Sequence, residues 1–408
     1  MTADLPVVDR YLELGLRLDH HVEGLVDAYY GPPALAARVK AEPTLAAARL
    51  ADDSHRIVAD LDGGAPLDPP DADGGDDPAR RAWIRAQAIG LGTTAERLAG
   101  VPIAFPDEIE RCYGVRPALV DEDDFLAAHR DLDEVLPGDG PLADRYIAWR
   151  EAQAVPVDRL RPAIDSLAED LRARTDTLFG LPDGEHVDVE LVTDQPWSGF
   201  NYYLGDLHSR VAINVDLPVL STSLAHLVAH EAYPGHHTEH SRKEVGLVRR
   251  RRRREESIFV VGAPQCLMAE GLADLGLSVV AGPEPGAAEA LAAEHLHPLG
   301  IAYDAEVVTR VAAASEVLAA VRGNVALLLH DEGASVDDAV AYAERFGLLP
   351  RARAEKAVQF QTDPTWRAYI FCYIDGLRLC RGFVGGDPAR FERLLSEQLL
   401  PSDLVAAA

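Results

Sequence analysis

Cysteine is scarce in this chain of 408 residues, and so are the usual marks of an exported or membrane-spanning protein. The cysteines include no Cys-x-x-Cys pair, so they indicate buried free thiols rather than a disulfide scaffold. Residues 1–6 lack the basic stretch followed by an apolar stretch that a signal peptide needs. No uninterrupted apolar run reaches the ~20 residues of a membrane span. We therefore expect a soluble, cytoplasmic protein that does not bind a membrane. The cysteines are Cys112, Cys266, Cys372 and Cys380.

Lysine is also rare, and arginine supplies nearly all the positive charge. The chain contains 39 basic and 67 acidic residues, and its net charge of -28 argues against binding to nucleic acid. The exception is Arg249–Arg254, an unbroken run of arginines followed by Glu255-Glu256. It could bind nucleic acid or an acidic partner, but we expect these arginines to pair with acidic groups of this chain or of a second subunit. The sequence leaves a monomer and a homodimer open.

The spacing of apolar residues changes along the chain, and a hydrophobic content of 48% excludes global disorder. An acidic loop rich in Gly and Pro, near 62–78, interrupts a helical N-terminal region, 1–180. Short β-branched or aromatic segments then predict strands at 186–193, 200–204 and 210–215. From Leu217, with Asp216 as a helix cap, the spacing is helical almost to the end. We predict a mainly α (α+β) protein with a small antiparallel sheet, and a second region at 181–408.

The most informative segment is His230-Glu231-Ala232-Tyr233-Pro234-Gly235-His236-His237, at the end of an apolar helical run. Imidazole is a common metal ligand, and an adjacent carboxylate is the usual base for a metal-bound water. On a continuous helix, His230 and His236 would point about 240° apart. Pro234 ends a helix and Gly235 permits a sharp turn, so these two residues would allow both imidazoles to bind one ion.

Two other histidine pairs are alternatives. His237 would lie on the same helical face as His230, but about 10 Å farther along the axis. His226 and His230 have the i, i+4 spacing of a common metal motif, but no Glu follows His226.

A catalytic zinc needs a third protein ligand and one open position. Glu270 is our first candidate, because it lies in an apolar helical stretch where an unpaired carboxylate would be costly. Asp274, one turn later, could orient a histidine ring. The alternative region is Glu294, which His295 and His297 follow.

These motifs resemble those of a bacterial family, domain of unknown function 885, which is distantly related to gluzincin-type zinc metallopeptidases. The segment 230–237 resembles the family's His-Glu-x-x-Pro-Gly-His, and 270–273 resembles its Glu-Gly-Trp-Ala, with Leu272 in place of Trp. Residues 369–376 resemble its Tyr-x-x-Gly segment, so the likeness covers about 185–385. The resemblance implies a helical zincin-like architecture. It also implies one Zn²⁺ per chain, bound by His230, His236 and Glu270, with Glu231 as the general base.

Further residues are candidates for contact with a substrate. Tyr373 is our first candidate for stabilising an oxyanion and Tyr369 the second, since i, i+4 residues share a helical face. Arg378 could bind a substrate carboxylate, which would favour carboxypeptidase or dipeptidase action. Asn201 and Tyr203 could hydrogen-bond a peptide backbone.

We therefore predict a zinc-dependent hydrolase, a metallopeptidase that cleaves short peptides or related amides through a metal-bound water. The alternatives are a metal-dependent hydrolase or lyase of a non-peptide small molecule, and a non-catalytic metal-binding protein.

Overall fold

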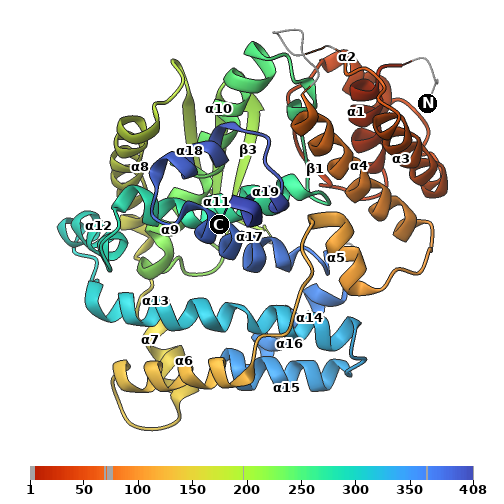
Figure 1. Cartoon of the computed structure of the whole chain (residues 1–408). Coiled ribbons are helices and arrows are strands. Elements are labelled where there is room, and N and C mark those ends of the chain that lie inside the picture. The colour runs from red at the N-terminus through yellow and green to blue at the C-terminus, as the bar shows by residue number, and fades with distance from the viewer. Residues whose placement is uncertain (1–4, 69, 71–76, 196, 364–365, 408) are drawn as a thin grey trace.

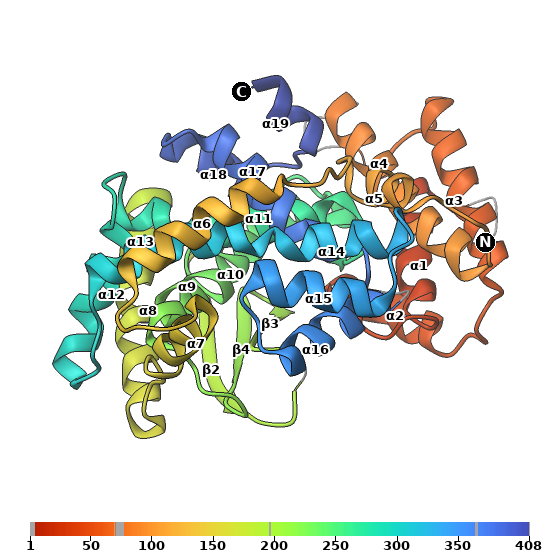
Figure 2. The ribbon, with the colours of Figure 1, turned by 90° about the horizontal axis from the view of Figure 1, so that it is seen from below.

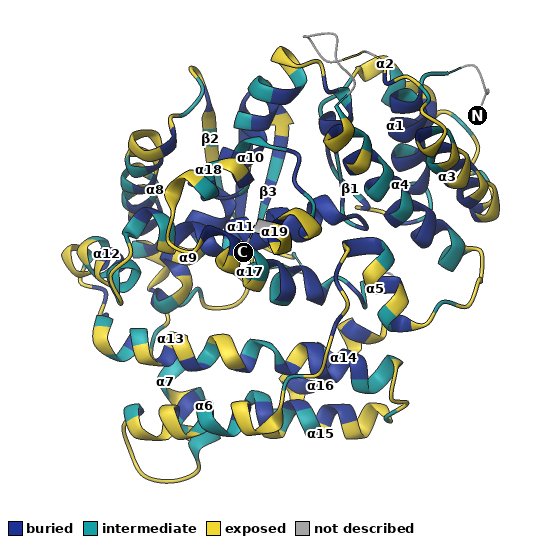
Figure 3. Cartoon of the chain, in the orientation of Figure 1, coloured by how far each residue is buried: buried dark blue, intermediate teal, exposed yellow. Residues whose placement is uncertain are grey.

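The computed structural model describes residues 5–68, 70, 77–195, 197–363 and 366–407. It shows a mainly helical protein with two small sheets, which confirms the predicted fold class (Figure 1). Seen from below, the helices α13 to α16 cover the face nearest the viewer (Figure 2). Buried residues concentrate in the central helices and strands, and exposed residues mark the outer faces of the peripheral helices (Figure 3). The apolar side chains form three hydrophobic cores.

The first core joins the N-terminal helices to a two-stranded sheet. The helices are α1 (Val7–Leu18), α2 (Pro33–Lys40), α3 (Ala47–Asp62) and α4 (Pro78–Leu98). Strand β1 (Val26–Tyr29) pairs antiparallel with β5 (Ile258–Val260), with an irregularity at Asp27. The acidic loop expected near 62–78 falls between α3 and α4, and its residues 69 and 71–76 lie outside the described part. Pairing with β5 attaches this N-terminal unit to the centre of the chain.

The second core lies in a layer of helices at the bottom of Figure 1. Its helices are α6 (Glu122–Val135), α7 (Leu142–Glu151), α13 (Ala305–Ala319), α14 (Val321–His330), α15 (Val336–Gly347) and α16 (Arg351–Thr362). The stretch Ala305–His330 is long and apolar enough to cross a membrane by length and composition alone, although charged residues interrupt it. Half of its most apolar window is buried inside the protein, so it packs here as a core helix.

The third and largest core occupies the centre of the molecule. Its helices are α5 (Phe105–Tyr113), α8 (Val157–Phe179), α9 (Ser221–Glu231), α10 (His236–Lys243), α11 (Pro264–Ala281), α12 (Ala287–Leu296), α17 (Ile370–Val384), α18 (Pro388–Ser396) and α19 (Pro401–Ala407). A π-helix (Glu244–Arg250) and two 3₁₀ helices (Arg254–Ser257 and His297–Leu299) complete the helical elements. Because this core draws on residues from 105 to 404, it crosses the boundary expected at residue 180.

The central sheet contains β2 (His186–Val192), β3 (Gly199–Gly205) and β4 (His208–Asn214) in the order β2-β4-β3. A tight connection makes β3 and β4 antiparallel, but β2 runs parallel to β4. The prediction of an antiparallel sheet was therefore wrong for β2. After β2, the chain passes the place that β4 will occupy and forms β3 on its far side, running opposite to β2. The chain then turns back into β4, which lies between the two and runs in the same direction as β2. Strand β3 forms an edge of this sheet and packs against α9.

Helix α9 begins later than expected. We predicted a start at Leu217 with Asp216 as the cap, but the first helical residue is Ser221, and Leu220 at the N-cap offers no side-chain hydrogen bond. The carboxylate of Asp216 instead accepts a hydrogen bond from the backbone amide of Asp194 (2.7 Å).

Candidate metal centre

Two helices meet in the segment 230–237. Helix α9 ends at Glu231 and α10 begins at His236, so the helix breaks where Pro234 and Gly235 predicted. Gly235 has no room for a side chain, because a Cβ there would lie 1.9 Å from the carbonyl oxygen of His230. The sharp turn places the rings of His230 and His236 edge to face, with centroids 4.6 Å apart.

A close crossing of α11 and α17 brings a third group to these imidazoles. A Cβ on Gly271 would lie 2.3 Å from the carbonyl carbon of Gly376, so both positions need glycine for the helices to approach. Glu270 precedes Gly271 and reaches His230 and His236. Tyr369, beside the start of α17, donates a hydrogen bond to Oε1 of Glu270 (2.6 Å).

The three side chains have the geometry of zinc ligands. The Nε2 atoms of His230 and His236 lie 3.1 Å apart, and Nε2 of His230 lies 3.4 Å from Oε2 of Glu270. The shortest distance between His236 Nε2 and Glu270 is 3.9 Å, to Oε1. A tetrahedral zinc with bonds of ~2.0–2.2 Å separates its ligand atoms by about 3.3 Å. Oε2 of Glu270 is buried and forms no hydrogen bond with any described residue, which is costly unless a cation binds it. The residues therefore fit a zinc ion.

Asp274 orients one of the candidate ligands. Its Oδ1 lies 2.9 Å from Nδ1 of His230, so the opposite ring nitrogen, Nε2, faces His236 and Glu270. A carboxylate behind a histidine is the usual outer partner of a metal ligand. His226 also approaches Asp274, with Nε2 at 3.4 Å. His226, His230 and Asp274 form a second possible ligand group, but the side chain of His226 is 45% exposed.

The electrostatics of this cluster favour a cation. Burial raises the pKa of Glu231 to about 7; His230 opposes this shift, and the charges of Glu270 and Asp274 add to it. Burial would also raise the pKa of Glu270, but the neighbouring imidazoles of His230 and His236 and the hydrogen bond from Tyr369 hold it below its usual range. Burial and the neighbouring His230 lower the pKa of His236 to about 4. Buried carboxylates beside a neutral imidazole create a negative potential that a divalent cation would neutralise.

Glu231 lies between the imidazoles and the sheet edge. Its carboxylate forms no hydrogen bond to any residue within the described ranges, and a Cβ on Gly199 of β3 would lie 3.1 Å from its Oε1. Asn201, also on β3, donates from Nδ2 to the backbone carbonyl of Glu231 (2.6 Å). Asn201 is buried, and the hydrogen bond that it forms positions the backbone of Glu231.

The two tyrosines form a chain of hydrogen bonds that leads to Glu270. Tyr369 contacts Glu270 directly, whereas Tyr373 donates a longer hydrogen bond to the hydroxyl of Tyr369 (3.4 Å). Burial raises the pKa of both hydroxyls well above their usual value, with the charge of Glu270 adding to the shift, so both remain protonated donors.

Three other candidates are engaged elsewhere. Arg378 forms an ion pair with Asp375 (2.8 Å), and its side chain is 67% exposed, so a surface pair replaces the predicted carboxylate contact. Tyr203 is buried, donates to Glu244 and stacks on His240, so it is a core residue.

His237 is also buried, and both of its ring nitrogens have partners, Glu185 and Ser209, each at 2.8 Å. It is therefore not the metal ligand that replaces His236. His295, in the alternative region for the third ligand, lies between Ser166 and Asp170 rather than in the cluster.

Three arginines of the run Arg249–Arg254 pair with acidic groups of this chain, as we expected for the run. Arg249 contacts Glu244 and Asp206, Arg253 contacts Asp77, and Arg254 contacts Asp9.

The sequence reasoning missed two charged residues near the cluster, Asp27 and Arg322. Burial and the charges of Glu270 and Glu231 raise the pKa of Asp27, on β1, to about 8. Arg322, at the start of α14, responds most strongly to Tyr373 and Asp274 among charged groups. Both residues are distant in sequence from the histidine motif, and no local pattern marks them.

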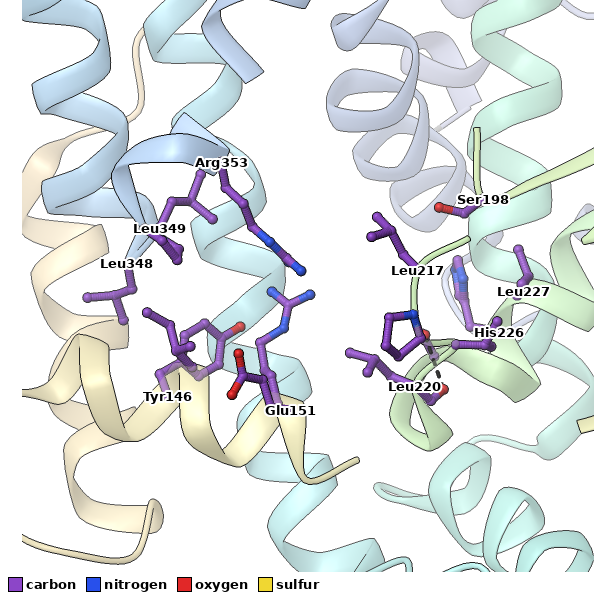
Figure 4. Close-up of a pocket in the computed structure, with 16 residues that line it drawn as sticks. Tyr146, Glu151, Ser198, Leu217, Leu220, His226, Leu227, Leu348, Leu349 and Arg353 are labelled. Carbon is purple, nitrogen blue, oxygen red and sulfur yellow. Dashed lines mark hydrogen bonds between the residues drawn. The ribbon is translucent and has the colours of Figure 1, made fainter. Parts of the chain in front are cut away.

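A cavity of about 570 Å³ adjoins the cluster (Figure 4). His226, Leu227 and Ser198 form part of one wall, and Arg353, Leu349 and Tyr146 form part of the opposite wall. The cavity therefore separates the metal-binding helix α9 from the layer that contains α7 and α16.

Comparisons with known proteins find no matching family model and no matching curated protein. Two solved structures are similar to this chain. For the putative lipoprotein from Colwellia psychrerythraea the TM-score is 0.51 at 14% identity, covering 92% of this chain and 68% of that one. For a putative lipoprotein of unknown function from Shewanella oneidensis the TM-score is 0.42 at 16% identity, covering 94% and 76%. At such identities the first comparison shows a shared fold alone, and the second carries no argument.

The comparison contradicts the expected cytoplasmic location. The structure from Colwellia psychrerythraea, whose fold this chain shares, is described as a putative lipoprotein. The expectation relied on the composition of the first few residues, and we withdraw it.

Proposed function

We propose that this protein is a zinc-dependent peptidase acting on short peptides. The observation that carries the proposal is the orphaned Oε2 of Glu270, which lies 3.4 Å from Nε2 of His230, which in turn lies 3.1 Å from Nε2 of His236. The outer partner Asp274 and the unbonded carboxylate of Glu231 add the features of a catalytic rather than a purely structural site.

The surrounding residues have distinct roles in this proposal. A zinc ion bound by His230, His236 and Glu270 would supply a Lewis acid and a more acidic bound water. Glu231, which has no partner of its own among the described residues, would accept a proton and donate it to the leaving amine. Tyr369 would hold the ligand Glu270 through its hydrogen bond, and Tyr373, whose hydrogen bond to Tyr369 is long (3.4 Å), would turn its hydroxyl to donate to the developing oxyanion.

Strand β3, at one edge of the central sheet, would align the peptide. Strand β3 is an edge strand, and Gly199 lies against Glu231. An extended peptide can add to such an edge through main-chain hydrogen bonds, which would place its scissile bond beside the base.

The test compares wild-type protein with Glu231→Gln, and with the matched surface change Glu169→Gln on α8. We expect about one tightly bound zinc per chain in all three proteins by elemental analysis. We expect wild type and Glu169→Gln to cleave members of a short-peptide library, and Glu231→Gln to lose at least about 100-fold of that activity.

Two results would overturn the proposal. Wild-type protein purified without chelator and lacking stoichiometric metal would refute the metal site. Zinc-loaded protein that cleaves no peptide would favour a non-peptide substrate or a non-catalytic metal site.

A further inference from the structure

The cavity beside the metal-binding helix is lined by two arginines that have no acidic partner among the described residues. Arg150 on α7 and Arg353 on α16 line it, together with Glu151 (Figure 4). Neither guanidinium forms a hydrogen bond or ion pair with any residue in the described part of the chain. The guanidinium carbon of Arg150 lies over the ring of Tyr146, 5.6 Å from the ring centroid.

These unpaired arginines contrast with the rest of the protein. The chain has a net charge of -28, and arginines elsewhere commonly bind carboxylates, as Arg367 does with Glu108 and Arg17 with Glu42. In so acidic a protein, acidic partners are abundant. A concave site with two free guanidinium groups is therefore suited to an anion from outside the chain.

The cavity opens next to the proposed base and ligands. His226 lines it and lies 3.4 Å from Asp274, the residue behind His230. Leu227 also lines it, and a Cβ on Gly199 would lie 2.8 Å from Leu227 and 3.1 Å from Glu231. One substrate molecule could therefore place its end in the cavity and its scissile bond at the metal centre.

We propose that this cavity binds the C-terminal end of the substrate and selects peptides that end in Asp or Glu. The two guanidinium groups that line the cavity, those of Arg150 and Arg353, match the α-carboxylate and the side-chain carboxylate of such a residue. The assignment to a peptide terminus rests on the proposed peptidase function, whereas dicarboxylate binding does not require metal.

The test measures binding of N-acetyl-L-glutamate and N-acetyl-L-glutamine by calorimetry, on zinc-loaded and on chelator-treated protein. We expect the glutamate derivative to bind at least about tenfold more tightly in both forms, because one charge-assisted contact is lost with glutamine. Arg353→Gln and Arg150→Gln should each remove most of this preference. Arg250→Gln, the same change in the exposed arginine run outside the cavity, should leave it intact.

The outcomes separate this proposal from the proposed function. Equal binding of both probes, or a preference that survives Arg353→Gln and Arg150→Gln together, would refute the dicarboxylate site. A preference seen only with zinc bound would also refute it, because the metal would then be the anion receptor. If the protein is a zinc peptidase but has equal kcat/KM for Ala-Ala-Glu and Ala-Ala-Gln, the proposed function would stand and the proposed specificity would fail. If the metal-free protein prefers the glutamate derivative, but the protein hydrolyses no peptide with any metal added, the dicarboxylate site would stand and the proposed peptidase function would fail.

Discussion

Two histidine–carboxylate clusters in this protein use the same residue types in opposite surroundings. His230, His236 and Glu270 lie at the junction of three helices in the interior. His186, Asp188 and His208 lie on β2 and β4, where the two histidines are paired in register. Both groups place their potential ligand atoms within 4.8 Å of one another, so spacing alone does not distinguish them.

The environment of the ligand atoms does distinguish them. In the strand cluster, each oxygen of Asp188 accepts one histidine at 3.0 Å, and the Asp188 side chain is 61% exposed. In the helix cluster, Glu270 keeps a buried oxygen without a hydrogen-bond partner, and Asp274 fixes the ring of His230. In the strand cluster the carboxylate oxygens are already hydrogen-bonded and hydrated, so binding a metal would stabilise them little. In the helix cluster a metal would provide the partner that the buried oxygen of Glu270 lacks, and would stabilise it strongly.

The largest expected effect is loss of the third ligand of the helix cluster. Glu270→Gln should weaken zinc affinity by more than the ~100-fold that loss of an outer partner causes, because it removes a charged ligand. Competition with a chromophoric chelator measures this affinity. Glu294→Gln, an exposed glutamate in the alternative ligand region, is the control and should bind zinc like wild type. The opposite ranking of these two variants would assign the third ligand to the 294–297 region.

A smaller effect is expected when the outer partner changes. Asp274→Asn keeps the shape of the side chain but removes the charge that holds His230, so zinc affinity should fall by ~10–100-fold. The same chelator competition measures it. Because His226 also contacts Asp274, we compare His226→Gln, which should have a weaker effect. If His226→Gln abolished zinc binding, the group of His226, His230 and Asp274 would be the true centre.

The sequence predicted that the side chains of His230 and His236 would meet, because the geometry that brings them together is local. Pro234 and Gly235 break one helix into two, so the meeting of His230 and His236 follows from eight consecutive residues. Glu270 was identified because a carboxylate in an apolar helix needs a partner. The three strands were placed within a few residues, although the parallel pairing of β2 depends on a chain path that periodicity does not encode.

The sequence is least informative about residues whose roles depend on packing between distant segments. Asn201 and Tyr203 are buried by α9 and α10, and their hydrogen bonds go to Glu231 and Glu244. Asp27 reaches the cluster through a strand that pairs with β5, more than 200 residues later. Arg322 faces Tyr373 only because α14 packs against α17. No spacing rule connects such pairs.

The smallest effect is expected in the strand cluster. Hydrogen bonds from His208 and His186 hold the pKa of Asp188 below its usual range, so any stability it contributes is present above its unfolded pKa and is lost as the pH falls through its folded pKa. Because the group is exposed, solvent screens this contribution, and Asp188→Asn should leave Tm at pH 7 unchanged by calorimetry. It should also leave the tightly bound zinc in place. If Asp188→Asn lost that zinc and Glu270→Gln kept it, the strand cluster would be the metal site and the helix cluster would not. The hydrated ligands would then bind the metal more tightly than the buried, orphaned carboxylate does.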